Sequence, residues 1–166
     1  MEEEYIYIGK IVNTHGIKGE LRILSNFKYK EKVFLENRRI YIGKEKIEEI
    51  VNSYRHHKIF EMITLKGYDN INQVLKYLNK EVYVKKNDLD LGEKEFLDED
   101  LINLSVIFNN REVGRVVAIR QINPKNKVIE AMINDKLTLI PYHEDFIGNI
   151  DFENKIIELK LIEGMI

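Results

Sequence analysis

A short loop between two apolar segments carries the residue types best suited to binding chemistry. Gly16 and Gly19 stand three positions apart beside Thr14, His15 and Lys18, so one turn displays a hydroxyl, an imidazole and a cation. Glycine is favoured where the backbone takes a positive φ or approaches another segment closely. The spacing therefore allows two interpretations, a plain hairpin turn and a turn that presents a binding site.

Two further segments favour contact with nucleic acid. Residues 27–34 interleave Phe and Tyr with lysines, Arg38 and Arg39 follow, and residues 55–58 form a second basic cluster. Stacking rings among cations suit single-stranded RNA. The alternative is a long loop held to the protein by Phe27 and Phe34, with its lysines in water.

The Gly-x-x-Gly spacing also occurs in KH domains, where it clamps a nucleotide backbone. In a KH domain this loop lies between helices. Here residues 5–12 are apolar and β-branched, and residues 20–24 begin with alternating polar and apolar types. Both flanks predict strands, so the KH interpretation fails.

Nothing in the sequence assembles a recognisable catalytic or metal-binding pattern. The chain has no cysteine, and it contains no HExxH spacing, P-loop or serine elbow. Adjacent His56 and His57 on a strand would point to opposite faces and could not share a metal. The acidic run 98–100 is typical of a solvated segment. We expect a protein without enzymatic activity, cofactor or metal.

The chain has 166 residues and a net charge of −2, but its charge is divided unevenly. Residues 1–86 hold 17 Lys and Arg against 12 Asp and Glu, whereas residues 87–166 hold nine against 16. Two oppositely charged units facing different partners would explain this division. The N-terminus lacks the pattern of a signal peptide, and no apolar run reaches the roughly 18 residues of a membrane-spanning helix. We expect a cytoplasmic protein that needs no more than a monomer.

Hydrophobic periodicity predicts a mainly β chain of two units. In residues 1–86 we expect one helix from Asn70 to Asn79, with Ile71, Val74, Leu75 and Leu78 on its apolar stripe and Asn70 paired with Gln73 as a capping box. The strands expected in this half are 5–12, 20–24, 39–42, 47–54, 59–65 and 81–85.

Residues 87–100 are acidic and aperiodic, and they predict a linker between the two units. Beyond them, turn signals at 109–110, 123–126 and 134–135 separate short strands, as in a sandwich or a small barrel. The strands expected in residues 101–166 are 105–108, 113–119, 128–133, 137–140 (closed by Pro141) and 155–161.

With these segments in place, the chain resembles the bacterial RimM family of ribosome maturation factors. The strongest match is residues 9–12 with residues 14–22, similar to that family's N-terminal signature. The other matching segments follow in the family's order: the loop 27–34, Gly67-Tyr68 before the helix, residues 100–104, and residues 139–141.

The resemblance implies a translation-factor-like β-barrel with one helix, followed by a PRC-type β-barrel. It also implies an assembly factor without catalysis that binds the maturing small (30S) subunit near its head, engages ribosomal protein nineteen of that subunit, and assists 16S rRNA maturation. A general RNA-binding barrel of OB type is the alternative. The residues that we expect to contact rRNA are His15, Lys18, Arg22, Lys28 and Lys30.

One position departs from the family's pattern. Family members commonly carry two adjacent tyrosines in the linker, associated with subunit binding, and the matching residues here are Phe96 and Leu97. Both phenolic hydroxyls are absent, so a partner would have to be held by apolar contact. We expect Phe96 and Leu97 to bind the partner, with a plug between the two units as the alternative.

Overall fold

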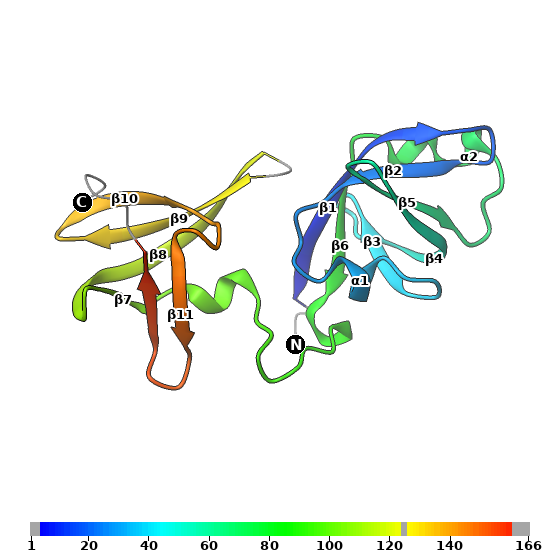
Figure 1. Ribbon diagram of the computed structural model, residues 1–166. Helices are drawn as coiled ribbons and strands as arrows, with labels where there is room; N and C mark the ends of the chain where they lie inside the picture. The colour runs from blue at the N-terminus through cyan, green and yellow to red at the C-terminus, as the bar shows by residue number, and fades with distance from the viewer. Residues whose placement is uncertain (1–3, 124–125, 161–166) are drawn as a thin grey trace. The chain divides into compact units, whose positions relative to one another are not determined.

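The computed structural model describes residues 4–123 and 126–160, and it confirms a mainly β chain. The chain divides into two compact units between Gly92 and Glu93 (Figure 1). The expected linker 87–100 therefore extends across this division. It contains most of the 3₁₀ helix η2 (Lys86–Asp88) and the start of η3 (Asp98–Leu101).

Six antiparallel strands of the first unit close into a barrel in the order β1-β2-β5-β4-β3-β6. Leu21 and Ile23 are fully buried while Arg22 between them faces outward, as the period of two requires. Closure leaves no unpaired strand edge. The strands are β1 (Tyr5–His15), β2 (Glu20–Leu24), β3 (Arg39–Ile42), β4 (Ile47–His57), β5 (Phe60–Leu65) and β6 (Glu81–Lys85).

The helix expected after Asn70 is shorter and more irregular than its apolar stripe predicts. It is one α-turn, α2 (Ile71–Val74), followed by the 3₁₀ turn η1 (Leu75–Tyr77). The capping box is confirmed, because Gln73 Oε1 accepts from the Asn70 N–H at 3.1 Å. The change of helix type rotates the following side chains. Tyr77 is consequently buried, and Leu75, expected on the apolar stripe, is 43% exposed.

A second short helix, α1 (Lys30–Val33), was not predicted. It lies in the segment 27–34, whose aromatic and lysine residues show no helical stripe.

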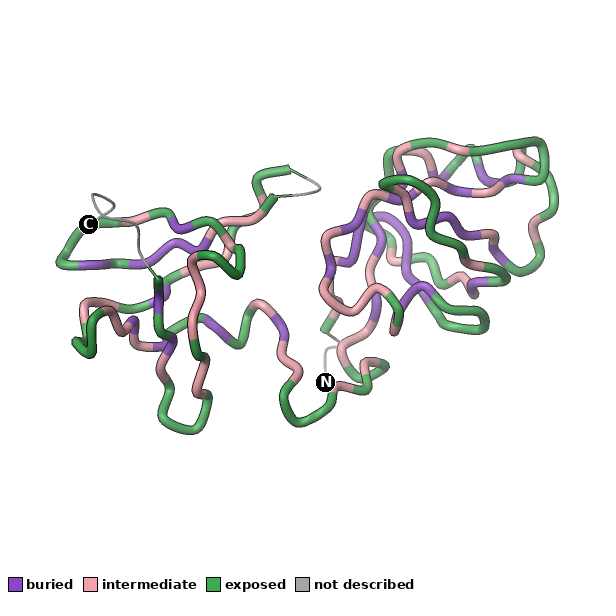
Figure 2. Tube along the Cα trace, viewed as in Figure 1, coloured by how far each residue is buried: buried purple, intermediate pink, exposed green. Residues whose placement is uncertain are grey.

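Figure 2 shows the alternation of buried and exposed positions along both units.

The second unit is a six-stranded sheet in the order β10-β9-β8-β7-β12-β11. Only the β12–β7 pair is parallel among the described strands. The sequence did not predict β11, whose residues Ile-Gly-Asn-Ile-Asp lack the β-branched run of a typical strand. Residue 161 of the expected last strand lies outside the described residues. The strands are β7 (Ser105–Phe108), β8 (Arg111–Asn123), β9 (Asn126–Ile133), β10 (Lys136–Pro141), β11 (Ile147–Asp151) and β12 (Ile156–Leu159).

Two predicted turns are confirmed in the second unit. Asn109 and Asn110 have φ of 52° and 62°, and Asn134 and Asp135 have φ of 50° and 66°. Each pair forms a two-residue hairpin loop with both residues in the left-handed region, a conformation that Asn and Asp tolerate.

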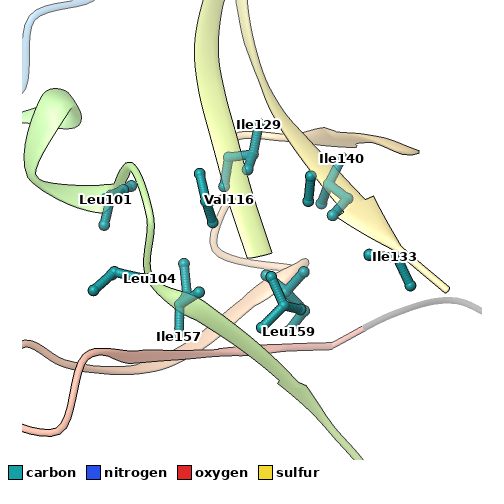
Figure 3. Close-up of a cluster of buried hydrophobic side chains, with 10 residues drawn as sticks. Leu101, Leu104, Val116, Ile129, Ile133, Ile140, Ile157 and Leu159 are labelled. Atoms are coloured by element: carbon teal, nitrogen blue, oxygen red, sulfur yellow. The ribbon is translucent and has the colours of Figure 1, made fainter. Parts of the chain in front are cut away.

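The core of the second unit is aliphatic (Figure 3). Phe96 from the segment before η3 packs against it. Its fully buried members are Leu101, Val106, Val116, Ile129, Ala131, Ile140 and Ile157. Among the described residues, no helix is long and apolar enough to cross a membrane.

Candidate nucleic-acid interface

The Gly16–Gly19 loop connects β1 to β2 and is fastened to the start of α2. Gly16 and Gly19 have φ of 77° and 88°, which confirms the expected turn. A Cβ on Gly19 would lie 3.0 Å from the Asn70 carbonyl oxygen, so a side chain would be crowded there. The Ile71 N–H donates to the Ile17 carbonyl at 2.8 Å. These contacts hold the loop while the side chains of Ile17 and Lys18 stay exposed.

Pairing of β1 with β2 brings His15 and Arg22 together. Arg22 Nη2 lies 2.7 Å from His15 Nδ1, and because a guanidinium can only donate, this ring nitrogen accepts. The guanidinium carbon of Arg22 is 5.5 Å from the centre of the Phe60 ring on β5. A cation above an aromatic ring on a strand surface is an arrangement suited to binding the phosphates and bases of RNA. The sequence motifs did not identify Phe60 as part of this site.

The basic cluster on β4 lies beside the same loop. Arg55 donates two hydrogen bonds to Glu20, at 2.9 and 2.7 Å. These bonds hold the pKa of the Glu20 carboxyl below its usual range. On β5, Met62 is paired with Arg22 of β2 on one side and with Arg55 of β4 on the other, so the three residues form one row across the sheet. Met62 itself is fully buried. Two clusters separated in sequence thus form one cationic face on β2, β5 and β4, which we call the β2–β5–β4 face.

The segment 27–34 is bound more tightly to the barrel than a stacking platform would be. Phe27 is 8% exposed and Phe34 is fully buried, so neither ring can stack on a base. This finding agrees with the alternative in which the two rings hold the loop to the barrel. Lys28, also expected to contact rRNA, is partly exposed beside Phe27.

Lys30, another of the expected rRNA contacts, belongs to a buried polar network. Its Nζ lies 3.8 Å from Oε2 of Glu61, a residue that is 1% exposed. The Tyr54 hydroxyl donates to Glu61 Oε1 at 2.7 Å, and His56 Nδ1 lies 2.9 Å from the same oxygen. Burial and this carboxylate raise the pKa of Tyr54 above its usual value. Lys30 therefore lies within ion-pair distance of β5, and its expected contact with rRNA stays a prediction.

Replacing Glu61 with alanine tests this network. The change removes the carboxylate that accepts from the part-buried Tyr54 hydroxyl and contacts His56, so we expect the free energy of unfolding to fall by about 2 kcal/mol. Urea unfolding measures this fall. Glu36→Ala, at an exposed position, is the matched control and should change stability by less than about 0.5 kcal/mol. Equal stabilities of the two variants would contradict the assignment.

Phe96 and Leu97 differ in accessibility. The Phe96 ring is partly exposed, and its centre lies 5.1 Å from that of Phe152. Leu97 is 4% exposed, and its N–H donates to Asp100 Oδ2 at 2.9 Å at the start of η3. The expectation that both side chains touch a partner stays a prediction, and the exposed area of Phe96 makes it the more accessible of the two.

Within residues 4–123 and 126–160, no group of three or more His, Cys, Asp or Glu is placed to hold a metal ion. The acidic run 98–100 is used locally instead. Asp98 pairs with Lys127 on β9, and Asp100 accepts from the Leu97 N–H.

Both units match domains of known proteins. The RimM N-terminal domain model matches residues 6–89, and the RimM PRC barrel domain model matches residues 98–165. Among solved structures, a putative 16S ribosomal RNA processing protein RimM from Pseudomonas aeruginosa is 20% identical, with a TM-score of 0.43 over 96% of this chain and 98% of that one.

Curated relatives match over nearly the whole chain. The ribosome maturation factor RimM of Exiguobacterium sp. strain AT1b is 35% identical, with 98% of this chain and 97% of that protein covered. The protein of the same name from Staphylococcus saprophyticus is 36% identical, with 97% and 98% covered. From its two matched domains and these relatives, the chain belongs to the RimM family of ribosome maturation factors.

Proposed function

We propose that this protein is a cytoplasmic, monomeric assembly factor that acts by binding rather than by catalysis. Its targets would be the head of the maturing small ribosomal subunit and ribosomal protein nineteen, and its binding would assist 16S rRNA maturation. The observation that carries this proposal is the match of both RimM domains, in order, to one chain. The relatives' name, ribosome maturation factor, supports the process.

The opposite net charges of the two halves support different binding partners for each half. The β2–β5–β4 face of the first unit offers Arg22 and the nearby Lys18 to rRNA phosphates. The second half carries 16 acidic against nine basic residues. Because ribosomal proteins are basic, this half would speed their encounter and shield them from premature contact with RNA.

Affinity capture from a bacterial lysate tests the proposal. We expect the tagged full-length protein to enrich immature small subunits, together with proteins of the subunit head. Tagged protein that enriches neither would refute the proposal. Enrichment of RNA of every kind, without preference for the subunit, would favour a general RNA-binding barrel.

Lys18→Ala tests the loop within this function. Loss of one phosphate contact should weaken binding to rRNA and reduce the slope of log K against log salt by nearly 1. Binding to the isolated head protein should change little. Lys44→Ala, at an exposed position in another turn of the same barrel, is the control. Equal losses on rRNA and on the head protein would contradict the role of Lys18.

A further inference from the structure

A cavity of about 210 Å³ lies in the first unit, apart from the Gly16–Gly19 loop and the β2–β5–β4 face. It is formed where the end of α1, the start of β3 with the two residues before it, the end of β6 and the end of η2 meet. Its polar lining comes from Lys32, Asn37, Arg38, Arg39 and Asp88, and its apolar lining from Val33, Val84 and Leu89.

The cavity is cationic, with three basic side chains against one acid. Arg38 and Arg39 are exposed, and neither guanidinium forms an ion pair or a side-chain hydrogen bond with any residue that the structure describes. Two other arginines of this protein are paired with acids, Arg55 with Glu20 and Arg120 with Glu130. Arg38 and Arg39 both line the cavity, and unpaired guanidinium groups are suited to bind phosphate oxygens, which accept pairs of N–H donors.

The backbone that carries these arginines is held rigidly. The Asn37 N–H donates to the Val51 carbonyl at 2.8 Å, and the Arg38 carbonyl accepts from the Val51 N–H at 2.9 Å. Lys66 Nζ donates to the Asn37 side-chain oxygen, which leaves the amide nitrogen as a further donor. A fixed backbone reduces the entropy lost when a ligand is bound.

The floor of the cavity is apolar and buried. Val33 is 2% exposed and Val84 is 3% exposed. Lys32 Nζ donates to the Asp90 carbonyl at 2.6 Å, which ties the chain beyond η2 to α1. Cationic groups beside an apolar floor suit a ligand that carries both a phosphate and a flat or weakly polar body. A nucleotide combines these two parts.

From this geometry we infer that the cavity binds one nucleotide unit of single-stranded RNA, with the phosphate on Arg38 and Arg39 and the sugar or base against Val33, Val84 and Leu89. The inference rests on the proposed RNA-binding function of the first barrel, and it adds a second RNA contact beyond the β2–β5–β4 face. Asp88 opposes the phosphate at this site and weakens its binding.

Fluorescence anisotropy of the full chain with a labelled ten-nucleotide RNA tests the inference. We expect Arg38→Ala with Arg39→Ala to weaken binding at least about tenfold at 0.15 M salt, and to reduce the slope of log K against log salt by about 0.7, which is the value for one phosphate charge on a single strand. Lys44→Ala with Lys80→Ala removes two cations from a separate hollow of the same barrel, and it should leave both values nearly unchanged. Equal effects of the two double variants would overturn the inference.

Two further measurements separate this site from a change in folding and from a free-nucleotide site. Asp88→Asn should strengthen RNA binding two- to threefold, a gain that misfolding cannot produce, and weaker or unchanged binding would count against the site. AMP should fail to displace the RNA at concentrations where an unlabelled strand displaces it, and displacement by AMP would overturn the assignment to a strand. If the Arg38/Arg39 variant binds RNA normally while the full chain still captures immature subunits, this inference fails and the proposed function stands.

Discussion

Gly114→Ala is expected to destabilise the second unit strongly, because the added Cβ has no room between two strands. A Cβ at this position on β8 would lie 1.7 Å from the Met132 carbonyl oxygen and 2.9 Å from the Ile133 Cα on β9. Both are backbone atoms, so no change of rotamer can relieve the clash. We expect β8 and β9 to separate locally and the free energy of unfolding to fall by about 3 kcal/mol or more.

Gly148→Ala provides the matched control in the same unit. Its added Cβ would meet the Glu158 carbonyl oxygen at 3.3 Å, a contact that a small shift can accommodate. Urea unfolding followed by circular dichroism should show a change of less than about 1 kcal/mol for this variant. Similar stabilities of the two alanine variants would contradict the close approach of β8 and β9 at Gly114.

Leu97→Ala is expected to have the second largest effect, and this effect is on the stability of the fold rather than directly on partner binding. Leu97 is 4% exposed, and truncation of a buried leucine to alanine costs about 2–5 kcal/mol because it removes apolar contacts and leaves a cavity. The nearby Ile102→Ala is the control, since Ile102 is 39% exposed and should cost less than about 1 kcal/mol. Thermal unfolding measures both, and a Leu97→Ala variant as stable as the control would contradict the burial.

Phe96→Ala separates binding from stability at the same segment. Phe96 is partly exposed and supported by Phe152, so we expect its loss to weaken subunit binding while the melting temperature falls less than in Leu97→Ala. Phe152→Ala removes the neighbouring ring without changing the segment before η3. If the two variants lose binding only in proportion to their melting temperatures, Phe96 supports the fold and does not contact the partner.

Strands with a strong local pattern could be predicted from the sequence, and weakly patterned elements could not. The strands β2, β3, β6 and β7 begin and end where alternation and turn residues place them. The strand β11 was missed because Gly148 and Asn149 interrupt its short apolar pattern, and its pairing with β12 is a tertiary effect. In α2 the capping box was recognised, but the change to a 3₁₀ turn after Val74 depends on packing rather than on local spacing.

The candidate nucleic-acid interface could likewise be predicted only in part from the sequence. The hairpin loop and its basic residues were visible in sequence, whereas the Arg22–Phe60 and Arg55–Glu20 contacts join strands distant along the chain. Lys30 resembled a free cation, but the carboxylate of Glu61, 31 positions later, lies 3.8 Å from its Nζ. Composition cannot distinguish a solvated lysine from one paired with a buried acid, because the distinction depends on strand register.

The proposal that this protein binds the maturing small subunit is tested most directly by sedimentation of the purified chain with purified subunits. The full-length protein is mixed at the same concentration with immature or with mature small subunits. The amount of protein that sediments with the two kinds of subunit should differ clearly. We expect the protein to co-sediment with immature subunits and to remain mostly unbound in the presence of mature ones. Equal binding to both, or binding to neither, would contradict the proposed function.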